Sequence, residues 1–97
     1  MIPKYFYIFG EKIKISRLKE VCKGTAYGQW VESNNKIEIA KTVYKDPIND
    51  EQQEQAYFHE LVHCLLQNIG EPDLCSDEVF VDKMGKALHQ ALKTSQY

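Results

Sequence analysis

Two histidines four residues apart, with a glutamate beside the first, are the residues of this chain best suited to chemistry. They are His59, Glu60 and His63, in the run HELVH. On an α-helix, positions i and i+4 project from the same face, so both imidazoles can reach one metal ion. Glu60 would then lie at the edge of that site, where a base can reach a metal-bound water. The pattern is that of HExxH zinc sites and predicts metal-assisted hydrolysis.

The sequence around this motif suits a helix that is buried on its other faces. Residues 56–65 contain no proline, and only the three motif residues carry titratable acid or imidazole groups. The alternative is a buried helix with two core histidines and a solvated glutamate. Core histidines rarely occur as a spaced pair with an acid between them, so we favour the metal site.

A third protein ligand is needed, because a catalytic zinc is held by three side chains and keeps a fourth position for water. Glu78 and Asp82 stand four residues apart on a second predicted helix and share a face. We assign Glu78 as the third ligand. Asp82 is placed to accept the second ring N–H of a ligand histidine, which we take to be His59. Asp77 is a reserve ligand only.

Alternatives remain for these acidic residues and for their neighbours on the same face. Asp77 and Glu78 could merely complement the helix dipole at its N-terminus. Gly85 shares the face of Glu78 and would let the second helix approach the first closely. His89 shares it too, but lies about 16 Å farther along the helix, so we interpret it as a polar surface histidine.

The three cysteines, Cys22, Cys64 and Cys75, form an odd set without a CxxC pair. This argues against a disulfide framework and against a zinc ribbon. We expect Cys64 to lie in the core as a reduced thiol. Cys75 is close in sequence to Glu78, so it remains an alternative metal ligand.

Length and composition are those of one ordinary globular domain, residues 1–97, with 43% hydrophobic and 27% charged residues. No apolar stretch approaches the ~20 residues that cross a bilayer. The N-terminal residues do not have the layout of a signal peptide. We therefore expect a cytoplasmic protein without a membrane partner.

The net charge of −2 is unevenly distributed. Residues 1–45 carry nine basic and four acidic groups, whereas residues 46–97 carry three basic and ten acidic groups. The acidic half contains the histidine motif, which suits a cation site. Arg17 is the only arginine. Because base reading and phosphate clamping rely on arginine, a nucleic-acid partner is poorly supported. A nucleic-acid-associated protein that uses the basic N-terminal half stays open as a third alternative.

The first half of the chain predicts two β-hairpins. Residues 5–9 and 12–16 flank Gly10, and residues 29–32 and 36–40 flank the turn at 33–35. Strands joined by such short turns must be antiparallel.

The second half predicts two helices. The first starts at Asn49 or Asp50, where Gln52 or Gln53 can complete a capping box, and ends before Gly70. The second starts between residues 73 and 76 and runs to about residue 94. Strands followed by helices give an α+β domain: a small antiparallel sheet of two hairpins with two packed helices on one side.

The motif with Glu78 and Asp82 on a second helix resembles the gluzincin metallopeptidases. The closer resemblance is to very small metallopeptidase-like proteins, often encoded by phages and other mobile elements, in which a short hairpin region precedes a strand, a polar loop and an HExxH helix. The likeness covers roughly residues 25–92 and implies a minimal zincin-like fold. The resemblance does not extend to the C-terminal domain of large gluzincins, so we expect no ligand from such a domain.

The resemblance implies Zn²⁺ held by His59, His63 and Glu78, with Glu60 as general base in the hydrolysis of a protein or peptide substrate. The strand at residues 36–40 is similar to the edge strand of this class, to which an extended peptide could add.

An oxyanion stabiliser is also required, and the candidates are Tyr27 and Tyr44, whereas Tyr57 is expected in the core. The alternative function is a catalytically vestigial metal-binding domain for regulation or protein interaction. A structural zinc in such a domain would have its fourth position closed by Cys75 or Asp77.

Overall fold

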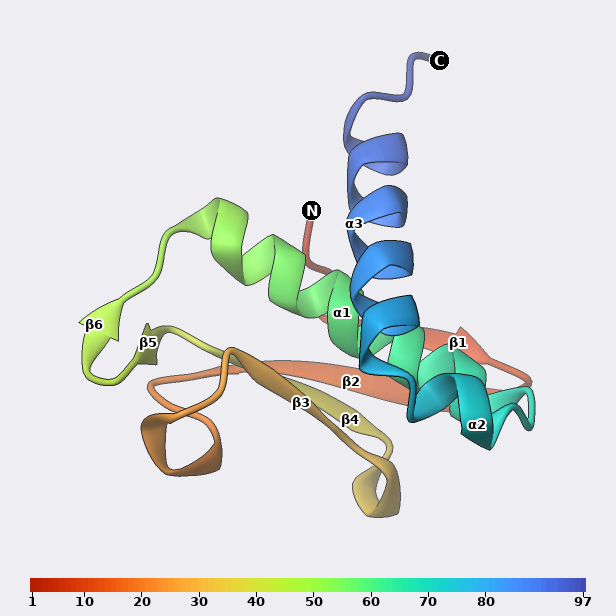
Figure 1. Cartoon of the computed structure of the whole chain (residues 1–97), viewed down its shortest axis with the longest axis horizontal. Helices are drawn as coiled ribbons and strands as arrows, with labels where there is room; N and C mark the ends of the chain where they lie inside the picture. The colour runs from red at the N-terminus through yellow and green to blue at the C-terminus, as the bar shows by residue number, and fades with distance from the viewer.

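Strands from the first half of the chain form a sheet, and helices from the second half pack on one of its faces (Figure 1). This computed structural model describes residues 1–97 and confirms the α+β class expected from the sequence. No helix is both long and apolar enough to cross a membrane. The elements are β1 (Tyr5–Ile8), β2 (Glu11–Leu18), β3 (Gly28–Val31), β4 (Lys36–Ala40), β5 (Thr42–Val43), β6 (Asp46–Pro47), α1 (Asp50–Asn68), α2 (Pro72–Cys75) and α3 (Glu78–Lys93).

The main sheet has the strand order β1-β2-β4-β3. Both hairpins are antiparallel as predicted, and they meet through a parallel pairing of β2 with β4 that the sequence did not reveal. The chain leaves β2, turns through the 3₁₀ segment Cys22–Gly24 and returns along β3 at the far edge. β4 then fills the position between β2 and β3, so it runs in the same direction as β2.

This order corrects one expectation that bears on function. The strand at residues 36–40 was predicted to be the edge strand, but β4 is flanked by β2 on one side and by β3 on the other. β3 is the edge strand on this side, and it contacts α1. The prediction failed because hairpin patterns fix the pairing within each hairpin but not the way two hairpins join.

The core lies between the sheet and α1. Ile13, Ile37 and Ile39 are fully buried on the inner face of the sheet, in keeping with the alternation of side chains along a strand. They pack against buried residues of α1, including Tyr57 and Cys64. The core positions predicted for these two residues are confirmed.

The capping box predicted for α1 is present. The Asn49 side chain accepts a bond of 2.8 Å from the Gln52 backbone N–H, and the Gln52 side chain accepts one of 3.0 Å from the Asn49 N–H. These bonds satisfy two of the N–H groups that a helix start leaves free. The helix ends just before Gly70, whose φ of +81° suits glycine.

The second predicted helix is divided in two. α2 ends at Cys75, and α3 begins at Glu78 after a break at Ser76 and Asp77. The Asp77 carboxylate accepts a bond of 3.0 Å from the Phe80 backbone N–H and so caps α3. Asp77 is therefore engaged as an N-cap rather than as the reserve ligand.

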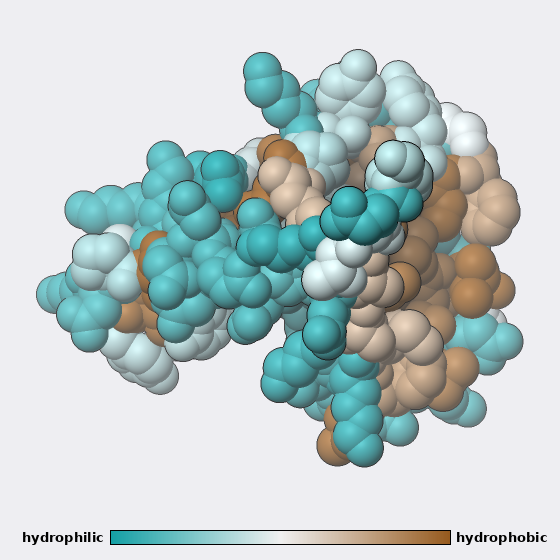
Figure 2. All heavy atoms as spheres, turned by 90° about the horizontal axis from the view of Figure 1, so that it is seen from above, coloured by the Kyte–Doolittle hydropathy of each residue, from teal (hydrophilic) through white to brown (hydrophobic).

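Hydropathy differs between the two ends of the molecule. In the view onto the helices, the surface over β5 and β6 is hydrophilic, and hydrophobic side chains gather at the opposite end, where β1 and α2 lie (Figures 1 and 2). The exposed apolar residues where α1, α2 and α3 join include Ile69, Leu74 and Val79. The N-terminal half of α1 thus lies toward the hydrophilic end.

α3 crosses α1 where Gly85 meets the backbone of His59. A Cβ atom at Gly85 would lie 3.1 Å from the Cα and 3.2 Å from the N of His59. The close approach expected from a glycine on this face is confirmed. Because the contact is to backbone, no side-chain rotation can relieve it.

Gly85→Ala should lower the free energy of unfolding by about 1–3 kcal/mol, since an added methyl group would overpack the crossing. The sign of this change distinguishes the contact from helix propensity, because an alanine in place of a helical glycine ordinarily stabilises by about 1 kcal/mol. Urea denaturation measures the change, with exposed Gln90→Ala on the same helix as the control. If Gly85→Ala is as stable as the parent, the two helices can accommodate a methyl group where they cross, and the close contact does not constrain them.

Candidate metal centre

The three predicted metal ligands converge where α1 and α3 cross. Nε2 of His59 lies 3.2 Å from Oε2 of Glu78, and Nε2 of His63 lies 3.1 Å from Oε1 of the same carboxylate. One ligand atom from each residue lies within 4.8 Å of the others. The two histidines come from one face of α1, and Glu78 comes from the first turn of α3. This group could hold a metal ion.

The donor set and its spacing fit a zinc ion. Two imidazoles and one carboxylate are a ligand combination of catalytic zinc sites. Two ligand atoms that each lie about 2.1 Å from a tetrahedral zinc are about 3.4 Å apart, close to the two distances observed to Glu78. The Glu78 side chain is 69% exposed, so the site is open to solvent on that side. An open side leaves room for a water or a substrate group.

The surroundings of His63 shift its imidazole toward the neutral form. Burial lowers the pKa of this imidazole, with the charge of His59 acting in the same direction and that of Glu78 opposing it. A metal ligand must be neutral at the coordinating nitrogen. The environment of His63 therefore favours the metal-binding form over the imidazolium.

Asp82 lies on the expected side of His59 but too far away for a direct hydrogen bond. Its Oδ1 is 3.8 Å from Nδ1 of His59, the ring nitrogen opposite the one that faces Glu78. Its second oxygen pairs with Lys86 at 2.9 Å. The negative charge of Asp82 can thus favour this orientation of the His59 ring, while the ion pair with Lys86 fixes the position of the Asp82 carboxylate.

Cys75 lies behind the ring of His63. Its Sγ is 3.5 Å from Nδ1 of His63 and 3.5 Å from the His63 carbonyl oxygen. Glu78 faces the other ring nitrogen, Nε2. The alternative of Cys75 as a metal ligand does not match this arrangement, because the thiol lies on the far side of the imidazole. Sequence proximity pointed to Cys75 but could not show on which side it lies.

The candidate base Glu60 is buried beside the ligands, with 9% of its surface exposed. Burial raises the pKa of its carboxyl to about 7; the charge of Glu78 adds to the rise, while His59 and the backbone N–H of Trp30 oppose it. Gly28 makes room for this side chain: a Cβ there would lie 3.2 Å from Cγ of Glu60 and 2.8 Å from the carbonyl oxygen of Glu38. β3 can therefore pass close to α1 at Glu60.

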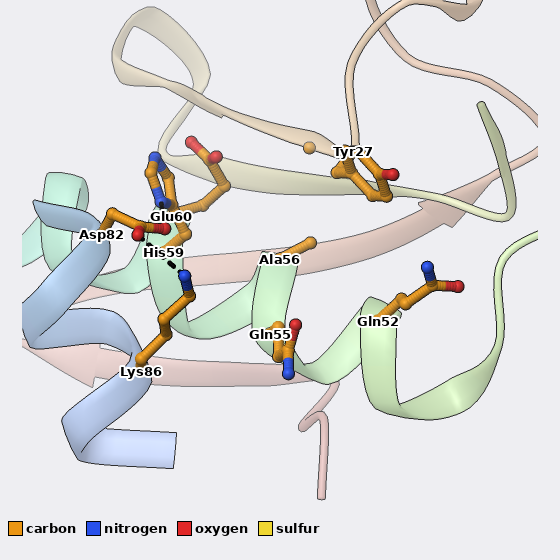
Figure 3. Close-up of a pocket in the computed structure, with 9 residues that line it drawn as sticks. Tyr27, Gln52, Gln55, Ala56, His59, Glu60, Asp82 and Lys86 are labelled. Atoms are coloured by element: carbon orange, nitrogen blue, oxygen red, sulfur yellow. Dashed lines mark ion pairs between the residues drawn. The ribbon is translucent and has the colours of Figure 1, made fainter. Parts of the chain in front are cut away.

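A cleft of about 430 Å³ opens beside Glu60. Figure 3 shows Gln52 and Gln55 along α1, Asp82 and Lys86 on α3, and Tyr27 across the cleft before β3. Two of its nine lining residues are hydrophobic, and the lining comprises Tyr27, Gly28, Gln52, Gln55, Ala56, His59, Glu60, Asp82 and Lys86.

The cleft separates the two tyrosine candidates for an oxyanion stabiliser. Tyr27 lines the same cleft as Glu60. Tyr44 is 72% exposed and lines a different hollow, with Lys23 and Lys45 among its neighbours. Tyr27 is therefore the tyrosine of the two that the structure brings to the candidate site.

His89 is not a surface histidine, and that prediction was wrong. It is 4% exposed and stacks on Phe58 with ring centroids 5.2 Å apart. Its Nε2 lies 2.9 Å from Oε1 of Glu54, and Glu51 completes a second group that could hold a metal ion. Nζ of Lys93 already lies 3.0 Å from the same Glu54 oxygen and also binds Glu51. Helix periodicity placed His89 far from the first site correctly but could not show that α1 covers it.

The Glu54 carboxylate is stabilised in its charged form by this cluster. The hydrogen bond from His89, followed by that from Lys93, lowers the pKa of Glu54. Lys93 thus supplies the positive charge that a metal ion would otherwise bring. The cluster ties the C-terminal part of α3 to the start of α1.

Comparisons with protein-family models, with curated proteins and with solved structures found no match for this chain.

Replacing Cys75 should weaken metal binding, because a partner behind a ligand imidazole fixes its orientation. We expect Cys75→Ala to bind zinc about 10- to 100-fold more weakly and Cys75→Ser to keep part of the affinity. Competition with a chromophoric chelator measures this, with exposed Cys22→Ala as the control. Equal zinc affinity in Cys75→Ala and Cys22→Ala would exclude a positioning role for Cys75.

Glu60 should destabilise the metal-free fold at alkaline pH. Its pKa rises from 4.5 to about 7 on folding, so the folded state disfavours the charged form. The stability that this group contributes below pH 4.5 is lost as the pH rises through about 7. Because one pKa unit corresponds to 1.36 kcal/mol, the loss amounts to about 3 kcal/mol.

Glu60→Gln, which has no charge to bury, should therefore be more stable than the parent at pH ~8 and similar to it at pH ~5. Urea denaturation in the presence of a chelator at the two pH values measures this, with exposed Glu71→Gln as the control. If the free energy of unfolding depends on pH in the same way in the parent and in Glu60→Gln, ionisation of the buried Glu60 does not destabilise the fold.

Proposed function

We propose that this protein is a zinc-dependent peptidase with Glu60 as its general base. The observation that carries the proposal is the convergence of His59, His63 and Glu78 beside a buried carboxyl that opens into a cleft. Three ligands with an open side are typical of catalytic zinc sites, whereas structural sites have four protein ligands. A zinc ion, when bound, supplies Lewis acidity that polarises a carbonyl and makes water more acidic.

Glu60 is suited to move the proton in such a reaction. A carboxyl whose pKa lies near neutrality can accept a proton from water and return it to a leaving amine. Its burial excludes bulk water on the side away from the cleft. Tyr27 faces the same cleft and is the candidate to stabilise an oxyanion.

Edge strand β3 is suited to bind an extended peptide. The Tyr27 carbonyl accepts a bond from the Ala40 N–H, and bonding alternates along an antiparallel pair. The backbone groups of Gly28 and Trp30 therefore point away from β4, toward the side where α1 carries Glu60. A substrate strand added there would lie along the cleft. In this proposal β3 takes the role that the sequence assigned to the strand at residues 36–40.

A structural or regulatory zinc site is the second candidate function. It would need a fourth protein ligand. Cys75 lies behind His63, and Asp77 caps α3, so each of the two residues proposed for that position is engaged elsewhere. This engagement favours the catalytic alternative over the structural one.

Elemental analysis of gently purified protein tests the metal site. We expect about one zinc per chain, and we expect Glu78→Ala to lose it or to bind it more weakly. The exposed Glu71→Ala, outside the ligand group, is the matched control. No stoichiometric metal in the parent after zinc is supplied would overturn the proposed site.

Glu60→Gln should retain zinc but lose hydrolysis of unfolded protein or of a peptide library, because an amide cannot accept the proton from water. Mass spectrometry of the digest detects cleavage, and metal analysis of the same sample verifies loading. Cleavage by metal-loaded Glu60→Gln at the parent's rate would remove Glu60 as the base. Zinc binding without cleavage by the parent would favour the structural or regulatory alternative.

A further inference from the structure

The face of the main sheet that is turned away from the helices exposes a pair of aromatic rings. Tyr5 and Tyr7 of β1 are 51% and 62% exposed. Their rings meet edge to face, with centroids 6.0 Å apart and an interplanar angle of 88°. Phe6 and Ile8, which alternate with the tyrosines along β1, pack against the core, so the rings project from the opposite face of the sheet. The two rings are therefore open to a ligand rather than part of the core.

Lysines of the neighbouring strands share this face with the tyrosines. Tyr7 pairs with Lys12 and Tyr5 with Lys14 in the β1–β2 register, and Lys14 pairs with Lys36 in the β2–β4 register. Paired residues project to the same side of a sheet. Nζ of Lys12 lies 4.4 Å from the centroid of the Tyr5 ring, and Lys36 binds Glu38 at 3.1 Å. Lys12 and Lys14 are both exposed.

We propose that this face, formed by Tyr5, Tyr7, Lys12, Lys14 and Lys36, binds single-stranded nucleic acid. Bases stack on exposed aromatic side chains, and lysines neutralise the phosphates beside them. Such binding needs no arginine fork, because the ring faces accept any base and the ammonium groups act as point charges. A duplex hides its base faces, so it cannot use the tyrosines in this way.

The arrangement of charge favours this occupant over a protein. A second copy of the chain or another protein would bury Lys12 and Lys14, which have no carboxylate partner, and burying unpaired ammonium groups is costly. A polyanion pairs with those lysines instead. The N-terminal half of the chain carries nine basic and four acidic groups, and most of the acidic groups belong to the half that contains the helices. A polyanion would thus be disfavoured near the helices and the candidate metal centre.

This inference favours the nucleic-acid alternative, which the sequence supported only poorly. The single arginine counted against that alternative, and composition cannot show that two tyrosines and three lysines share one open face. The inference is independent of the proposed peptidase activity, because none of these five residues lines the cleft.

Fluorescence anisotropy with a labelled oligothymidylate tests the proposal on the whole chain. We expect saturable binding at low salt that is tighter than binding of a duplex of the same length. Tyr5→Ala and Tyr7→Ala should each weaken it about five- to hundredfold, as loss of one stacked base predicts. Lys14→Ala should reduce the salt-dependence exponent by about 0.7.

Two matched variants keep the test specific. Tyr44→Ala removes a tyrosine that is more exposed than Tyr5 or Tyr7, and Lys83→Ala removes an exposed lysine of α3; both should leave binding unchanged. Circular dichroism and thermal unfolding verify that each variant is folded, and Lys14→Ala provides a variant that leaves the rings intact. Absence of binding, equal binding of duplex, or equal loss in Tyr44→Ala and Tyr7→Ala would overturn the proposal. Light scattering that shows a dimer lost in Tyr7→Ala, without oligonucleotide binding, would assign the face to a second copy instead.

Discussion

The contact between Gly85 and the backbone of His59 is the constraint on which the candidate site depends. It sets the distance between α1 and α3 at the point where the first histidine leaves α1. Because Glu78 lies about two turns before Gly85 on α3, this distance also decides whether its carboxylate reaches both imidazoles. The cluster of Glu51, Glu54, His89 and Lys93 holds α3 on the other side of the crossing. α3 is thus attached to α1 on both sides of the glycine.

A second close approach, between β3 and α1, determines the chemistry of Glu60. Gly28 lets the edge strand pass so near that the carboxyl is buried, while the backbone of Trp30 partly offsets the rise in its pKa. Burial alone would keep this acid protonated, and full exposure would leave it a weak base. β3 thus influences the pKa of the Glu60 carboxyl and also forms one wall of the cleft. Two glycines, one in the sheet and one in a helix, provide the space for the whole arrangement.

Much of the local structure could be predicted from the sequence. Alternation gave both hairpins, the capping box of Asn49 and Gln52 gave the start of α1, and helix periodicity placed His59, His63 and Glu78 on faces that could meet. These features depend on neighbours within a few residues, where spacing determines geometry. The contact at Gly85 was also predictable, because a glycine on the ligand face removes the side chain that would keep the two helices apart.

The remaining features depend on contacts between distant segments. The parallel β2–β4 pairing, and with it the edge position of β3, follows from how two hairpins join, which no local pattern records. The burial of His89 depends on α1 passing over it, and the place of Cys75 behind His63 depends on the break between α2 and α3. In each case the sequence shows the residue type but not the distant segments that pack around it.

The position of the three ligands along the chain has a thermodynamic consequence. His63 and Glu78 are separated by about 15 residues that include α2 and the break before α3. An ion bound to both would close this segment into a loop, and loop closure restricts the unfolded chain much as a covalent cross-link does. Binding energy would then appear as folding energy. The stability of the packing of α3 on α1 would then depend on the concentration of zinc, as would any chemistry at the first turn of α3.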